Sequence, residues 1–191
     1  MKQQVRTFVA VELDPAIRSG AAELIEKLRA VPADVKWVAA ENMHLTVKFL
    51  GDVDVREIHH VCQAVTLAVA ELAPFSLEVR GAGAFPNLHR PRTIWLGVRE
   101  GAEAMTELAR RVESELAKLG FPKEGRPFQA HLTIGRIRHG GPELADLGRL
   151  VQQHAEQEIG DTSVDELVVF SSELTRSGPI YEPLGHASLG G

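Results

Sequence analysis

Two short segments of the chain pair a histidine with a threonine at the same spacing, His44-Leu-Thr46-Val and His131-Leu-Thr133-Ile. Each lies in an apolar stretch typical of a buried strand, where neither side chain is favoured. In a strand, residues i and i+2 point to the same face, so each histidine shares a face with its threonine. Because imidazole exchanges protons near neutral pH and a hydroxyl donates hydrogen bonds, each pair is suited to acid-base chemistry beside an anion.

The repetition of this motif favours a functional role over a chance occurrence. The chain holds 8 histidines in 191 residues, and shuffling this composition gives about 0.3 His-x-Thr triplets by chance. A single copy is also typical of a structural hydrogen-bonded pair. Two copies with the same leucine and a following β-branched residue indicate a repeated functional motif. Because nearly half of the chain separates them, we expect two lobes that each contribute one copy.

Side by side, the two motifs would bring two imidazoles and two hydroxyls to one small volume. A phosphate group fits there, because the hydroxyls can donate to its nonbridging oxygens while the imidazoles flank the phosphorus atom. One histidine can then take a proton from the nucleophile while the other gives one to the leaving oxygen. This pattern predicts in-line displacement at phosphorus.

The segments that must position these motifs alternate between strand and helix periodicity. The order is strand, helix, two strands, helix, two strands, helix, strand, helix and two strands, which is typical of an α+β fold with antiparallel sheets. No linker rich in proline and glycine divides the chain. Predicted strands cover residues 5–13, 35–39, 44–50, 75–85, 92–98, 131–137, 164–174 and 181–189, and predicted helices cover 15–28, 55–72, 102–119 and 142–158.

Composition narrows the class of protein. Hydrophobic residues at 44% and charged residues at 25% are ordinary for a globular protein. The net charge of -5 argues against a protein that coats nucleic acid, and we expect no DNA partner. The N-terminus does not read as a signal peptide, and no apolar run approaches the length of a membrane span. The single cysteine, Cys62, excludes an internal disulfide, so we expect a cytoplasmic protein with a core thiol. We also expect a monomer.

The chain resembles a known family, the two-histidine (2H) phosphoesterases, and within it the RNA 2′,3′-cyclic phosphodiesterases, also called 2′-5′ RNA ligases. The resemblance extends over nearly the whole chain. It rests on the segments RTFVAVEL, VKWVAAENMHLTVKFLGD, RGAGAFPNLHRPRTIWLGV, RPFQAHLTIGR and LVVFSSEL. It implies a single bilobal α+β domain over residues 1–191, with two antiparallel sheets related by a pseudo-two-fold axis, helices outside and a central cleft.

The resemblance also implies an activity. The expected reaction is hydrolysis of a 2′,3′-cyclic phosphate, on an RNA 3′ end or a nucleotide, to a 2′-phosphate, without metal or other cofactor. By the family's pattern His44 is the proton donor to the leaving 3′-oxygen, and His131 is the proton acceptor that activates water. Thr46 and Thr133 hold the phosphate.

Four further residues are candidates for substrate binding. Arg136 matches a family arginine near the phosphate, but its odd offset from His131 puts it on the opposite strand face unless a bulge or strand end occurs near Gly135. Lys48 lies at an even offset from His44, so we expect it on the cleft side or at a solvated strand end. Phe128 and Arg126 flank the second motif and are candidates for stacking on a base, although a core position also suits Phe128.

The remaining histidines lie in predicted helices, in loops or near chain ends: His59, His60, His89, His139, His154 and His186. No paired-cysteine, His-Glu-x-x-His or glycine-rich phosphate motif appears, so we expect neither a catalytic zinc nor a Walker-type site. Three alternatives stay open: a cyclic phosphodiesterase for small nucleotides, an RNA ligase, and a module that binds a nucleotide without turnover. Substrate choice is expected to lie in the loops at residues 84–92 and 120–128.

Overall fold

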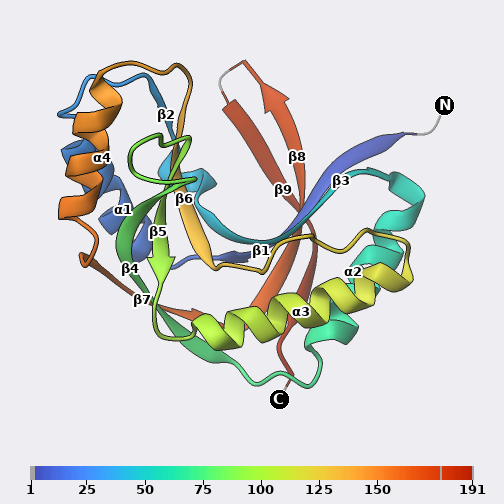
Figure 1. Ribbon diagram of the computed structural model, residues 1–191. Helices are drawn as coiled ribbons and strands as arrows, with labels where there is room; N and C mark the ends of the chain where they lie inside the picture. The colour runs from blue at the N-terminus through green and yellow to red at the C-terminus, as the bar shows by residue number, and fades with distance from the viewer. Residues whose placement is uncertain (1–2, 177, 191) are drawn as a thin grey trace.

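The computed structural model describes residues 3–176 and 178–190. Strands and helices alternate along the chain much as the periodicity predicts (Figure 1). The strands are β1 Gln4–Glu12, β2 Val35–Trp37, β3 His44–Asp54, β4 Phe75–Phe85, β5 Thr93–Val98, β6 His131–Ile137, β7 Glu158–Val164, β8 Glu166–Thr175 and β9 Gly178–Ser188. The α-helices are α1 Pro15–Leu28, α2 Ile58–Val69, α3 Ala102–Lys118 and α4 Glu143–Gln153, and the short 3-10 helices are η1 Ala40–Asn42 and η2 Val55–Glu57.

The described strands form two sheets. The first sheet is four-stranded in the order β3-β1-β8-β9, and the second is five-stranded in the order β2-β6-β5-β4-β7. All their strand pairs are antiparallel. Helices α2 and α3 pack beside the first sheet, and α1 and α4 pack beside the second (Figure 1). The α+β class with antiparallel sheets is therefore confirmed.

The order of elements repeats within the chain. The series β1, α1, β3, α2, β4 is followed by β5, α3, β6, α4, β8, apart from the extra strands β2, β7 and β9. Strand β4 pairs with β5, and β8 pairs with β1, so each half of the chain supplies a strand to the sheet of the other half. This exchange interlocks the halves and makes β3 and β6, the motif strands, equivalent elements of the two sheets.

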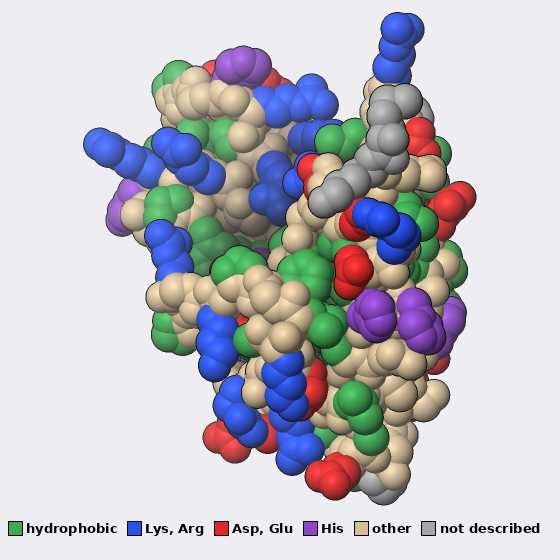
Figure 2. All heavy atoms as spheres, turned by 90° about the vertical axis from the view of Figure 1, so that its right-hand side faces the viewer, with side chains coloured by type: hydrophobic (Ala, Val, Ile, Leu, Met, Phe, Trp, Pro, Cys, Tyr) green, Lys and Arg blue, Asp and Glu red, His purple; other side chains and the backbone are tan. Residues whose placement is uncertain are grey.

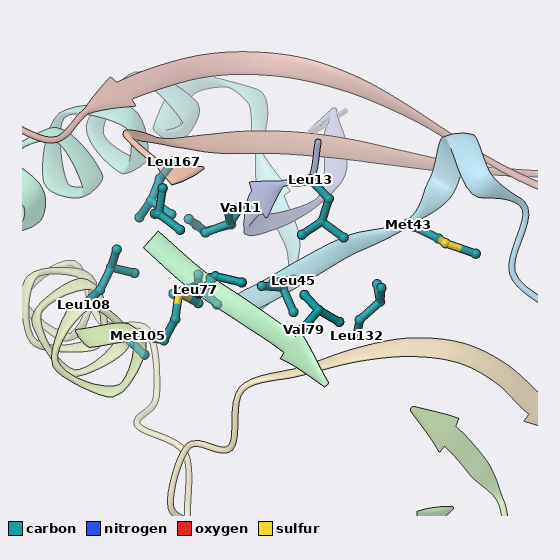
Figure 3. Packing of buried hydrophobic residues seen from close by; sticks show 14 of the residues in the cluster. Val11, Leu13, Met43, Leu45, Leu77, Val79, Met105, Leu108, Leu132 and Leu167 are labelled. Carbon is teal, nitrogen blue, oxygen red and sulfur yellow. The ribbon is translucent and has the colours of Figure 1, made fainter. Parts of the chain in front are cut away.

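A continuous hydrophobic cluster joins the two halves. Leu45 of β3 and Leu132 of β6, the leucines inside the two motifs, are 1% and 0% exposed and belong to this cluster. Figure 3 shows both side chains among the packed residues between the strands. Burying side chains of this size contributes about 1.5–3 kcal/mol each. The leucines therefore anchor the strands and leave the opposite faces to the histidines and threonines.

The boundaries of the elements differ most from the expectation at two places. The predicted helix at residues 142–158 ends at Gln153, and Glu158–Val164 forms strand β7, which the sequence pattern did not indicate. This segment is largely polar and contains a glycine, so its strand conformation comes from pairing with β4. Strand β3 also continues beyond Gly51 to Asp54. Among the described residues, no helix is both long and apolar enough to cross a membrane.

Candidate active site

The two motifs occupy the same position in equivalent strands. His44 is the first residue of β3, and His131 is the first residue of β6. In both strands the residues at the first and third positions are partly exposed, and those at the second and fourth are buried. The period-2 prediction for the motifs is therefore confirmed. Strands β3 and β6 contact each other where the two sheets meet, so both motifs lie at the junction of the lobes.

The two histidines are held by the same hydrogen bond. Nδ1 of His44 lies 2.9 Å from the carbonyl oxygen of Asn42, and Nδ1 of His131 lies 2.8 Å from that of Gln129. Because a carbonyl oxygen can only accept, Nδ1 carries the proton in both rings. Nε2 is then the atom of each ring that is left to take up or release a proton.

Aromatic side chains orient both imidazoles. The ring of His44 lies 4.8 Å from that of Phe8 and meets Tyr181 edge-on at 5.2 Å. His131 meets Phe85 edge-on at 5.1 Å. These contacts fix the ring planes, because an aromatic neighbour restricts rotation of the imidazole about its side-chain bonds.

The environment of His44 shifts its proton equilibrium. Burial, and to a smaller extent the positive charge of Arg18, lower the pKa of His44 from 6.5 to about 4, although the hydrogen bond to the carbonyl oxygen of Asn42 partly opposes them. His44 is therefore neutral at pH 7 in the protein without substrate. An anion placed beside the ring would favour imidazolium and raise this pKa.

A bulge after each motif changes which later residues face the cleft. The pairing of β3 with β1 skips Val47, and the pairing of β6 with β5 skips Ile134. Both are the fourth residues of their motifs. A bulge reverses the alternation of side chains beyond it. The fifth residues after the two histidines, Phe49 and Arg136, are thereby brought to the same face as the histidines.

Contacts and charges agree with this reversal. The ring of Phe49 lies 5.7 Å from that of Phe8, which also touches His44, and Phe49 is 54% exposed. Burial raises the pKa of Tyr181, and the charges of Arg136 and Arg6 partly oppose this rise. Arg136 of the second sheet is thus close enough to act on Tyr181 of the first. The structure therefore contains the bulge near Gly135 that is needed for Arg136 to share a strand face with His131.

The expectation for Lys48 was wrong. Its side chain is 3% exposed, and Nζ lies 2.9 Å from the carbonyl oxygen of Pro122 and 3.4 Å from a carboxylate oxygen of Glu113. It is therefore neither on the cleft side nor a solvated strand end. The reason is the bulge at Val47, which turns Lys48 away from the face of His44. Lys48 fastens the loop after α3 to the first lobe.

The two candidate residues that precede the second motif have different surroundings. Phe128 is partly buried and packs against the main hydrophobic cluster, which matches the core position considered for it. Arg126 is exposed on the loop before β6. Within residues 3–176 and 178–190, no group of three or more His, Cys, Asp or Glu side chains is placed to hold a metal ion.

A cavity of about 570 Å³ opens beside His44. It lies over the first sheet, and α1 and η1 close its other side. Apart from His44, none of the site residues predicted from the sequence lines this cavity. Tyr181, the single tyrosine of the chain, is the sequence feature that could have indicated it. Figure 2 shows that the surface is hollowed between its two halves, with Lys and Arg side chains around the hollow. The lining residues are Glu12, Arg18, Ala39, Glu41, Asn42, Met43, His44, Phe170, Gly178, Pro179, Ile180, Tyr181, Pro183 and His186.

Together these groups have a defined chemical capacity. Two imidazoles present Nε2, each with its Nδ1 proton engaged by the backbone. Thr46 and Thr133 add hydroxyls on the same strand faces, and Arg136 adds a cation. Paired imidazoles can transfer one proton in each direction, and hydroxyl and guanidinium donors stabilise charge on phosphate oxygens.

Comparison with known proteins agrees with this chemistry. A family model described as LigT like Phosphoesterase matches residues 11–95 and 96–181. An RNA 2′,3′-cyclic phosphodiesterase of Methanothermobacter thermautotrophicus is 38% identical over 179 residues, covering 93% of this chain and 95% of the relative. A protein of the same name from Archaeoglobus fulgidus is 38% identical over 180 residues, covering 94% of this chain and 98% of the relative.

Solved structures share the fold over almost the whole chain. The structure of TT0787 of Thermus thermophilus matches with a TM-score of 0.78 and 28% identity, covering 97% of this chain and 98% of that chain. Escherichia coli LigT complexed with 3′-AMP matches with a TM-score of 0.76 and 26% identity, covering 98% of this chain and 99% of that chain. The similarity therefore includes both lobes and both motif strands.

Proposed function

This chain belongs to the LigT like phosphoesterase family, and we propose that it is an RNA 2′,3′-cyclic phosphodiesterase that produces a 2′-phosphomonoester. The observation that carries the proposal is the duplicated His-x-Thr motif with its two equivalent imidazoles. Both rings have Nδ1 bonded to a backbone carbonyl and Nε2 left for proton transfer. A site that only bound a nucleotide would need no such pair of proton-transfer groups.

The reaction follows from the roles that the family resemblance assigns. His131 Nε2 takes a proton from water as the water oxygen forms its bond to phosphorus. His44 Nε2 gives a proton to the 3′-oxygen as the bond between phosphorus and that oxygen breaks. Thr46, Thr133 and Arg136 donate hydrogen bonds to the nonbridging oxygens, whose charge grows in the transition state. One proton is taken up by His131 and one is released by His44, so each cycle ends with the protonation states of the two histidines exchanged, and proton exchange with water restores them.

The low pKa of His44 sets a condition on this scheme. Since His44 is neutral at pH 7 before substrate binds, its proton must be supplied as the complex forms. The negative charge of the cyclic phosphate supports this, because an adjacent anion raises the pKa of imidazole. An imidazolium whose pKa remains low is also a strong proton donor.

Cys62 takes no part in this scheme. It is partly buried on α2, where its Sγ lies 3.9 Å from the carbonyl oxygen of Leu184 on β9, and burial raises the pKa of its thiol. A thiol with a raised pKa is a poor nucleophile. A single cysteine that forms no disulfide supports our further proposal that the protein acts in a reducing cytoplasm.

The decisive experiment is turnover of adenosine 2′,3′-cyclic phosphate followed by phosphorus NMR. We expect hydrolysis to adenosine 2′-phosphate. Tight binding without product would instead indicate a nucleotide-binding module. Formation of mainly the 3′-phosphate would indicate that His44 is the base and His131 the acid. The low pKa of His44, taken alone, would favour that assignment.

A further inference from the structure

Trp95 of β5 lies on the same face of the second sheet as the second motif. It pairs directly with Thr133 on β6 and with Gly83 on β4, and paired residues of an antiparallel sheet share a face. A methyl group on Gly83 would overlap Cη2 and Cζ2 of Trp95 and lie 2.9 Å from Cε2. The Nε1 atom of the indole is buried with no hydrogen-bond partner among the described residues. Packing on the bare backbone of Gly83 therefore holds the ring close to the sheet.

Phe85 connects this indole to His131. The ring centroids of Trp95 and Phe85 are 5.1 Å apart, and those of Phe85 and His131 are also 5.1 Å apart, with the latter two rings edge-on. Nδ1 of the same imidazole is bonded to the backbone. One polar contact and one aromatic contact thus fix the plane of the His131 ring, and the aromatic contact rests on Trp95.

The first sheet fills the corresponding positions differently. There the strand neighbour of Thr46 is Ala10, and the next residue in that row is Val168. Both neighbours are 0% exposed and belong to a small hydrophobic cluster on the face of that sheet. An alanine and a valine therefore suffice to fill the space beside a motif threonine, so the much larger Trp95 has a further role.

The next row of each sheet indicates what that role is. In the first sheet Phe170 pairs with Phe8, and their rings stack at 5.4 Å. In the second sheet the corresponding pair is Phe85 and Thr93, so Phe85 has no aromatic partner in its own row. Trp95 supplies that partner from the neighbouring row.

We propose that Trp95 is a positioning residue for His131 and acts through Phe85. The proposal rests on the function proposed above, in which Nε2 of His131 takes a proton from water. The indole lies on Gly83 and supports Phe85, which meets the imidazole edge-on and restricts its rotation. Without this support Nε2 would no longer be held toward the attacking water, and a misplacement of about 1 Å can lower a rate about 100-fold.

Kinetics of the full chain with adenosine 2′,3′-cyclic phosphate test this role. Trp95→Ala removes the indole, and Gly83→Ala pushes it off the sheet. Each should lower kcat about 10- to 100-fold and change KM less than about 3-fold, because the phosphate donors remain. Trp37→Ala is the matched control and should leave kcat unchanged. Trp37 is the other tryptophan of the chain and also covers a glycine, Gly135, but it packs against the main hydrophobic cluster.

Nitrogen-15 NMR of the imidazoles measures the positioning itself and needs no turnover. At alkaline pH, where imidazoles are neutral, wild-type His131 should be a single tautomer with its proton on Nδ1. In Trp95→Ala and Gly83→Ala it should become a mixture of two tautomers. His44 should remain a single tautomer in the same spectra, because its aromatic neighbours belong to the first sheet.

A double variant separates positioning from the filling of space. Gly83→Val combined with Trp95→Ala gives the second sheet the valine and alanine that the first sheet has in this row. It should recover stability that Trp95→Ala alone loses, because the void is refilled. The value of kcat should stay about 10- to 100-fold below the wild type, because Phe85 still lacks its aromatic partner.

Three outcomes would overturn the proposal. Recovery of kcat in the double variant would mean that Trp95 only fills space. Mixed tautomers of both His44 and His131 would mean that Trp95 supports the fold as a whole. An unchanged kcat in folded Gly83→Ala would show that the place of the indole does not matter. If His131 alone changes its tautomer but the wild type turns over no substrate, the proposed function fails and the support of His131 by Trp95 stands.

Discussion

His44 and His131 make the same hydrogen bond, from Nδ1 to the carbonyl oxygen two residues earlier, at 2.9 Å and 2.8 Å. The two rings differ in their surroundings, since His44 lies between Phe8 and Tyr181 and His131 beside Phe85. The shared bond sets the same tautomer in both rings, and the different neighbours can set different proton affinities. The pair is therefore suited to act as one acid and one base.

Each histidine should be needed for most of the activity. His44→Ala and His131→Ala should each lower kcat about 100- to 10,000-fold, the range for loss of a general acid or base. The double variant should be little worse than either single variant, because the two groups act in one step. Kinetics with adenosine 2′,3′-cyclic phosphate would measure this, with His59→Ala on the exposed face of α2 as the control. Losses that multiply independently would contradict concerted acid-base catalysis.

The motif threonines should act on the phosphate and not on the fold. Thr46→Val and Thr133→Val keep the side-chain shape but remove a donor, so each should lower kcat/KM about 10- to 1000-fold with the fold retained. Thr66→Val is the control, because the Thr66 hydroxyl donates to the carbonyl oxygen of Cys62 within its own helix. Circular dichroism would verify folding. Unchanged kinetics in both motif variants would show that the hydroxyls serve the strands alone.

The pH dependence should reflect the low pKa of His44. Activity needs one protonated and one neutral histidine, so it is lost when both are protonated. Since the pKa of His44 is about 4 without substrate, kcat/KM should stay high down to about that pH and then fall. The acid limb of kcat should lie at higher pH, because bound phosphate raises the pKa of His44. NMR titration of the His44 ring would check this, and an acid limb of kcat/KM near the ordinary imidazole value would argue against it.

Arg136 should matter for phosphate affinity because the bulge turns it toward the motif face. Arg136→Gln removes a charge-assisted donor, which is worth about 1.5–3 kcal/mol, so inorganic phosphate should bind about 10- to 100-fold more weakly. Arg138→Gln, just beyond the end of β6, is the matched control. Calorimetry on both variants would measure the difference. Equal losses would indicate only the general effect of one positive charge.

Lys48 should contribute to stability and not to catalysis. Lys48→Met leaves the Pro122 carbonyl and Glu113 without their cation, which should cost about 1–3 kcal/mol of unfolding free energy. Values of kcat/KM should not change. Lys118→Met, which removes an exposed pair with Glu115, should cost less than about 1 kcal/mol. Urea unfolding and steady-state kinetics would measure the stability and the activity of both variants. A loss of turnover without a loss of stability in Lys48→Met would indicate that Lys48 acts in the cleft.

Local patterns in the chain were enough to predict the motif faces and most of the elements around them. Alternation of apolar and polar residues placed His44 and Thr46 on one side of β3 and Leu45 on the other, because a strand has a period of two residues. The repetition of the motif predicted two lobes, and the order of strand and helix patterns predicted the α+β fold with antiparallel sheets. Local chemistry suffices for these features, since the pleat of a strand and the apolar character of the leucines need no distant partner to specify them.

The features beyond the fourth residue of each motif depend on contacts between distant segments. A bulge depends on the pairing of β3 with β1 and of β6 with β5, so sequence alternation put Lys48 on the wrong face and left Arg136 undecided. The segment of β7 is a strand because β4 pairs with it. The cavity beside His44 joins Arg18 to Tyr181, which are far apart in the chain, so no local pattern could reveal it. The low pKa of His44 has the same origin, because the ring is buried and lies near the charge of Arg18 only in the folded protein.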